Sequence, residues 1–135
     1  MSKEYEKRIA EALAPLGGAG LTFSRVVIEQ AAEGYASLKV GATGKYCRLH
    51  ALVGTMGTAA GTVVIQSSTD ISGADTGAGQ VALSGVMPIG VNGGVVIPFT
   101  ADKRACIVTA VSTSLGMTTV TGAFHGYAVV SIGDA

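Results

Sequence analysis

The sequence has 135 residues, which is enough for one domain with an additional arm or tail. Only 13% of the residues are charged, against about a quarter in a typical soluble domain, while 48% are hydrophobic and 20 are glycine. The formal net charge is zero and no basic stripe with interleaved aromatic residues is present, which excludes the electrostatic surface of a nucleic-acid binder. Because a surface so poor in charge is usually covered by a partner, the composition indicates an oligomer.

The start of the sequence is too charged for a secretory signal. A third of all charged residues lie within residues 1–11, and no cleavage site follows them. The longest apolar stretches are interrupted every few residues by Gly, Pro, Ser or Thr, so none approaches the roughly 20 residues that a bilayer span needs. We therefore expect a soluble protein made in a cytoplasm, without a membrane partner.

Residues 1–20 are predicted to form an arm, with an amphipathic helix over about residues 2–14 followed by a glycine hinge. One stripe of this helix is apolar and consists of Tyr5, Ile9, Ala12, Leu13 and Leu16. Pro15 ends the helix, and the glycines of residues 17–20 form a flexible joint. A single helix of this length is marginal in water, so its stripe must dock on its own domain, on a sister subunit or on another protein.

Residues 21–135 show a different pattern, with a hydrophobic period of two over short segments rich in Val, Ile, Thr and Tyr. The predicted strands are residues 25–30, 35–40, 45–53, 61–67, 80–87, 94–99, 104–113 and 117–131. About eight short strands without helical pattern between them predict an all-β domain, either a sandwich or a barrel of antiparallel strands. Among these architectures we favour a jelly-roll-like one.

Three segments carry more detailed predictions. In residues 45–53, an apolar face of Cys47, Leu49, Ala51 and Val53 alternates with a mixed face of Tyr46, Arg48, His50 and Leu52. Gly122 and Gly126 divide the last predicted strand, either as bulges in one long strand or as a break between two short ones. Residues 70–79 have no periodicity and predict an exposed loop.

The two cysteines, Cys47 and Cys106, each lie inside a predicted strand. We favour two buried free thiols that behave as small hydrophobic side chains. A disulfide would form only if the two strands faced each other, which the sequence leaves open.

The histidines, His50 and His125, are the residues around which an active site or a metal site could be assembled. No nucleophile elbow, His-Glu-x-x-His or Cys-x-x-Cys motif accompanies them, so we assign no catalytic, cofactor-binding or metal-ligating residue. Instead, we expect both to be surface or interface histidines, lining the contact between copies of the chain. The expected protein is not an enzyme and takes no small-molecule substrate.

Four strand-like segments have a residue pattern that is known from one family of proteins: residues 45–53, 61–67, 82–98 and 120–127. The third segment contains the glycine-rich turn Asn92-Gly93-Gly94 before an apolar strand. Over about residues 35–131, the chain resembles the head decoration, or cement, proteins of tailed bacteriophages. The resemblance implies a homotrimer on the outer surface of the virion capsid, made in the host cytoplasm and bound to the major capsid protein. It also implies an N-terminal arm that reaches the capsid lattice, a role that residues 2–20 would take here. The resemblance assigns no individual binding residue, and our hypothesis for the contacts is Tyr5, Ile9, Leu13 and Leu16 of the apolar stripe.

Two other classes of protein fit the same pattern. One is the head domain of a phage fibre or spike, although a long repetitive stalk is missing from this sequence. The other is a small β-barrel that binds a ligand in its interior, or an unrecognised hydrolase. The latter class predicts a polar pocket that converges on His50 or His125.

Overall fold

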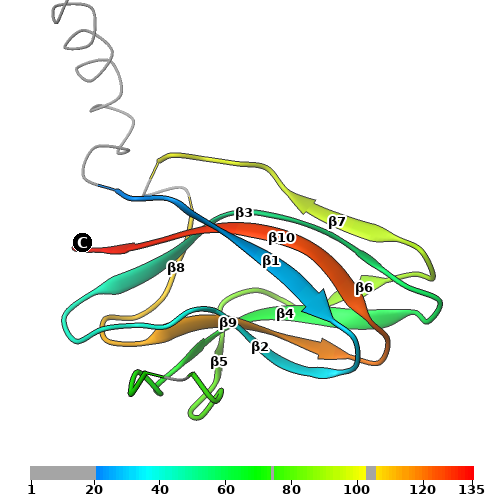
Figure 1. Ribbon diagram of the computed structural model, residues 1–135, viewed down its shortest axis with the longest axis horizontal. Coiled ribbons are helices and arrows are strands. Elements are labelled where there is room, and N and C mark those ends of the chain that lie inside the picture. The colour runs from blue at the N-terminus through cyan, green and yellow to red at the C-terminus, as the bar shows by residue number, and fades with distance from the viewer. Residues whose placement is uncertain (1–20, 74, 103–105) are drawn as a thin grey trace, which may run out of the picture.

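The computed structural model describes residues 21–73, 75–102 and 106–135, so the predicted helix and its apolar stripe lie outside the described residues. The described chain is all-β, with ten strands in two antiparallel sheets and no helix. In Figure 1 the two sheets form two layers, with β1, β10 and β3 in one and β2, β9 and β4 in the other. The prediction of an all-β domain of antiparallel strands is confirmed.

The strand order of each sheet follows from the pairing of strands far apart in the sequence. Sheet A has the order β1 (Ser24–Gln30), β10 (Phe124–Gly133), β3 (Tyr46–Met56) and β7 (Gly94–Ile97), and β8 (Ile107–Val108) also pairs with β3. Sheet B has the order β2 (Gly34–Lys39), β9 (Ser114–Val120), β4 (Gly61–Ser68) and β5 (Val81–Ala82), and β6 (Met87–Ile89) also pairs with β4. The first four strands therefore alternate between the two layers, and β9 and β10 also lie in different layers.

Two of the predicted strands are wrong over most of their length. In residues 80–87, Leu83 and Ser84 both donate a backbone hydrogen bond to the Ile65 carbonyl, and the Ser84 hydroxyl accepts one from the Ile65 amide. These bonds to Ile65 of β4 replace the regular strand pairing between β5 and β6. In the described part of the other strand, residues 106–113, pairing is limited to β8, because the Thr109 hydroxyl accepts the hydrogen bond of the Cys47 amide and a turn follows.

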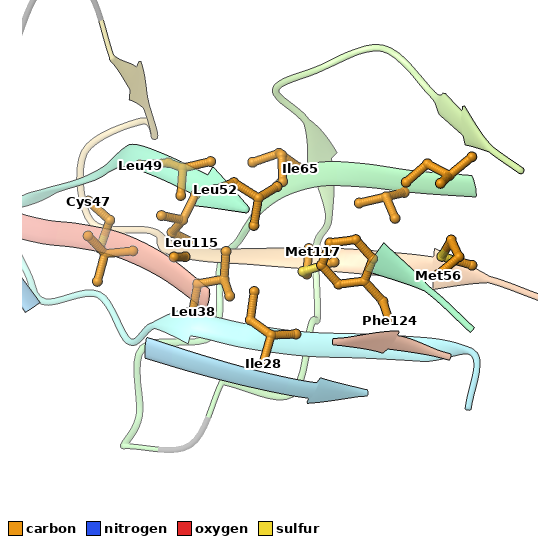
Figure 2. Packing of buried hydrophobic residues seen from close by; sticks show 14 residues of the cluster. Ile28, Leu38, Cys47, Leu49, Leu52, Met56, Ile65, Leu115, Met117 and Phe124 are labelled. Carbon is orange, nitrogen blue, oxygen red and sulfur yellow. The ribbon is translucent and has the colours of Figure 1, made fainter. Parts of the chain in front are cut away.

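The core lies between the two sheets and draws on both (Figure 2). Its fully buried larger side chains include Leu49, Leu52 and Phe124 from sheet A and Ile65, Leu115 and Met117 from sheet B. Packing of this kind supplies the main stabilising free energy of a domain of this size.

A β-bulge at His50 changes which face of β3 points inward. Val129 pairs with Ala51 and Val130 with Leu49, so His50 has no partner on β10. Before the bulge the odd-numbered residues Cys47 and Leu49 face the core, and after it Leu52 and Met56 do. The predicted alternation is therefore wrong beyond Leu49, and Val53 lies on the outer face rather than in the core.

Gly54 provides the space that the Phe124 ring occupies. A Cβ atom at Gly54 would lie 2.2 Å from the Cζ atom of Phe124. We expect Gly54→Ala to lower the free energy of unfolding by about 1–3 kcal/mol, because the fully buried ring has to shift. Urea denaturation measures this loss, with Gly85→Ala as control, since a Cβ atom at Gly85 meets no atom within 4 Å. Equal losses in the two variants would contradict the packing explanation.

Candidate functional site

The structure does not bring the two histidines together. His50 is buried, with 0% of its surface exposed, whereas His125 is exposed on the outer face of sheet A, where it pairs with Glu29 and Thr55. The prediction of His50 as a surface or interface residue is wrong, because Phe23 and the chain after β7 cover it. The role of His125 between copies of the chain stays a prediction.

Both ring nitrogens of His50 are hydrogen-bonded. Nδ1 lies 2.9 Å from the Thr100 carbonyl oxygen, and Nε2 lies 2.7 Å from the Ser131 hydroxyl. Because a carbonyl only accepts, Nδ1 carries the proton of the neutral ring and Nε2 accepts from Ser131. Burial, and to a lesser degree the nearby Arg48 guanidinium, lowers the pKa of His50 below its ordinary 6.5, against the opposing effect of the Thr100 bond.

In a nucleophile–base pair, a serine hydroxyl is hydrogen-bonded to one nitrogen of a histidine ring, and an acceptor holds the other nitrogen. Ser131, His50 and the Thr100 carbonyl have the same arrangement. Here, however, Ser131 is only 1% exposed and the Phe23 ring lies edge-on to His50, 4.7 Å between centroids. Among the described residues, the Ser131 hydroxyl is therefore covered rather than open to a substrate. The His50 cluster, as we call His50, Ser131, Thr100, Phe23 and Phe99, instead holds β3, β10 and the segment after β7 together.

Arg48, next to the His50 cluster, is a second buried polar residue of β3, with 2% of its surface exposed. Its Nη2 atom donates to the Asp134 carbonyl oxygen at 2.7 Å, while Nε and Nη1 have no hydrogen-bond partner. The exposed ion pair between Lys45 and Asp134 adds a second link to the C-terminal residues. Because exposed pairs contribute little, the buried Arg48 contact is the more important tie.

Neither Cys47 nor Cys106 is in a disulfide, as favoured from the sequence. Cys47 is buried and Cys106 is half-buried, so the prediction that both are buried is correct only for Cys47. Burial raises the pKa of Cys47 to about 11 and also raises that of Cys106. Both therefore stay protonated near neutral pH, which does not suit a nucleophile.

The loop of residues 70–79 lies beside sheet B and is organised by Asp70. The Asp70 carboxylate accepts hydrogen bonds from the amides and hydroxyls of Ser72 and Thr76, which lower its pKa well below the ordinary range. Tyr35 of β2 donates to Asp75, and this bond together with burial raises the pKa of Tyr35. The Asp70 carboxylate is therefore hydrogen-bonded within the loop, and the Asp75 carboxylate joins the loop to sheet B.

The outer face of sheet A carries an apolar row that crosses four of its five strands. Val27 of β1 pairs with Tyr127 of β10, Tyr127 with Val53 of β3, and Val53 with Val96 of β7. Val27 and Val96 are each 65% exposed, and Tyr127 and Val53 are half-buried. We call these four residues the apolar row. The sequence prediction missed it because the row combines one residue from each of four separate segments.

Two hollows lie at the end of the sandwich formed by the turns after β1, β3 and β9, and they share Thr121. Their walls consist mainly of Ala, Gly and Thr, and Glu33 is the one ionisable residue lining either hollow. The Glu33 carboxylate accepts from the Thr121 amide at 3.3 Å. Neither hollow includes a histidine, so the polar pocket that a ligand-binding barrel or hydrolase would place around His50 or His125 is not formed by these two.

Comparison with protein-family models, curated proteins and solved structures finds no match. The described residues contain no group of three or more His, Cys, Asp or Glu side chains placed to hold a metal ion. Across residues 21–73, 75–102 and 106–135, no helix has the length and hydropathy required to cross a membrane.

The apolar row, with its exposed Val27 and Val96, is the best candidate functional site in the described part of the chain.

Proposed function

We propose that this chain is a structural virion protein that decorates and stabilises the outer surface of a phage capsid. It acts as a homotrimer bound to the major capsid protein, and it performs no catalysis. The observation that carries the proposal is the apolar row, an exposed aliphatic strip on a protein with only 13% charged residues. A face of this kind is typical of a surface that another protein covers.

The strand order supports a jelly roll as the finer description of the fold. If β5 and β6 count as one interrupted strand, and β7 and β8 as another, the chain has eight strands. When these eight strands are numbered along the chain, sheet A has the order 1-8-3-6 and sheet B has the order 2-7-4-5. Two four-stranded sheets interleaved in this way correspond to the double Greek key of a jelly roll, a fold found in viral capsid proteins.

The arm of residues 1–20 gives each subunit a second contact with the capsid lattice, through Tyr5, Ile9, Leu13 and Leu16. Three arms on one trimer bind together at a high effective concentration, so weak individual contacts add up to firm attachment. His125 is exposed beside Glu29, which supports its assignment to the contact between subunits in this proposal.

The proposal is tested by mixing the purified protein with empty, expanded capsids of the phage whose genome encodes it. We expect co-sedimentation with the capsids, and electron microscopy should show trimeric density at three-fold positions. Deletion of residues 1–20 should reduce binding at least about 100-fold, the avidity lost with the arms, while the circular dichroism of the β-domain is retained. A monomer at micromolar concentration that leaves the capsids bare would contradict the proposal.

A further inference from the structure

The two outer faces of the sandwich differ in what covers them. On sheet B, Thr118 of β9 donates to Gln66 of β4, and Tyr35 of β2 is bonded to the loop of residues 70–79. Among the described residues, no such loop covers the middle of the outer face of sheet A. The apolar row is exposed there, apart from the Tyr127 ring, over which the Arg25 guanidinium lies at 4.4 Å from the ring centroid. Its flanking charges are Arg25 and Glu29, both on β1. We therefore expect the outer face of sheet A to be the one that another segment or protein covers.

The described chain begins on this same outer face. The Leu21 side chain approaches Gly133 of β10, where a Cβ atom would lie 3.9 Å from Leu21 Cδ2. The Phe23 ring packs on His50 and on Phe99, with centroids 4.7 Å and 5.6 Å apart. Figure 1 shows this start of the chain passing beside the end of β10 before it enters β1. Residues 1–20 are thus attached at one end of the face that carries the apolar row.

We propose that, in the free protein, residues 1–16 fold back and dock their apolar stripe on the apolar row of the same chain. The hinge between residues 16 and 21 reaches up to about 17 Å, and the path along β1 from Phe23 to Val27 is about 13 Å. A helix over residues 2–14 is about 20 Å long, while four strands span about 14 Å between the outer two. The arm is therefore long enough to reach and cover the row.

Apolar side chains also lie between the attachment point and the row, beside the exposed Arg25. Phe99 is 56% exposed and lies beside Phe23, and Val129, half-buried, lies next to Tyr127 on β10. The charged residues of the arm lie on the opposite side of its stripe, so docking leaves them in water. Docking of this kind does not depend on the capsid role. If that role holds, the stripe has to leave the row before it can contact the capsid.

The chain contains no tryptophan, so Tyr5→Trp introduces a single fluorescent reporter into the arm. We expect the tryptophan emission of this full-length variant to lie at shorter wavelength, and to be quenched less by iodide, than that of a peptide of residues 1–16 with the same substitution. Adding Val27→Asp and Val96→Asp should move both readouts to the peptide values. Val120→Asp is the matched control, since Val120 is a 50% exposed valine on sheet B, and it should leave them unchanged.

Three results would overturn the proposal: emission like that of the peptide in the parent variant, no response to the row substitutions, or an equal response to Val120→Asp. Docking on another copy is a further contradicting outcome. To detect it, chains with Tyr5→Trp, Val27→Asp and Val96→Asp are unfolded and refolded with excess wild-type chains. Recovery of the short-wavelength emission would show that the arm docks on a neighbour, whereas an arm that docks only on its own chain gives no recovery.

Discussion

Replacing Phe124 by alanine is expected to lower the free energy of unfolding by about 3–5 kcal/mol. The ring is fully buried, lies over Gly54 and occupies the core between the sheets near Met117 and Met56 (Figure 2). Its removal leaves a cavity that β3 and β10 cannot close, because both strands are fixed by their pairing along the sheet. Since domains are stable by only about 5–15 kcal/mol, this one change removes a large share of the total.

Urea denaturation at fixed protein concentration measures the loss, and Phe99→Ala is the matched control. Phe99 is also a phenylalanine, but it lies in the segment after β7, 56% of its surface is exposed, and it contacts Phe23 and His50 rather than the core. Its substitution should therefore cost clearly less. A loss in Phe124→Ala no larger than that in Phe99→Ala would mean that the core does not depend on this ring.

The period-two pattern was sufficient to predict the long strands. β1, β2 and β4 begin and end within one residue of the predicted segments, because each keeps one face on the core. This holds although the pairing of β2 with β9 has a register shift between Ser37 and Lys39. The break in residues 117–131 was also among the expected alternatives. Thr121 and Gly122 both have positive φ, at 63° and 82°, and they form the turn between β9 and β10.

The alternation in β3 could not be predicted beyond Leu49, because a bulge is a property of two strands. The extra residue, His50, is recognisable only once Leu49 and Ala51 are placed opposite Val130 and Val129. The same limit applies to the burial of His50, since Phe23 and Thr100 cover it from distant parts of the sequence.

The apolar row escaped prediction for a related reason. Val27, Val53, Val96 and Tyr127 are unremarkable within their own segments, and their alignment depends on the strand order β1, β10, β3, β7. A low charge content predicts that an apolar surface exists somewhere on the protein, but the register decides where it lies.

Lowering the pH from 7.5 to 5 is expected to reduce the free energy of unfolding through His50. Its pKa in the folded protein lies below 6.5, because burial disfavours the charged ring, whereas the unfolded chain takes up the proton near the ordinary value. Between these two pKa values the unfolded state binds more protons than the folded state. The stabilising contribution is therefore complete above pH 6.5 and is lost as the pH falls through the window, by at most about 1.4 kcal/mol per pH unit.

Protonation also changes the hydrogen bonding of the His50 cluster. Nε2 accepts from Ser131 in the neutral ring, and a protonated ring would donate there instead, so the Ser131 hydroxyl would have to find another acceptor in a buried position. The nearby Arg48 guanidinium adds repulsion to the second positive charge. Asp70 stays ionised throughout this range, because its hydrogen bonds lower its pKa, so it does not produce the same pH dependence.

Urea denaturation at several pH values, with histidine-to-glutamine variants, tests this assignment. Gln keeps one donor and one acceptor but does not titrate, so His50→Gln should have nearly constant stability between pH 7.5 and 5. His125→Gln is the matched control and should retain the slope, because His125 is exposed on the outer face of sheet A. If the slope persisted in His50→Gln and vanished in His125→Gln, the pH sensitivity would belong to the exposed histidine, and the buried His50 cluster would not be its source.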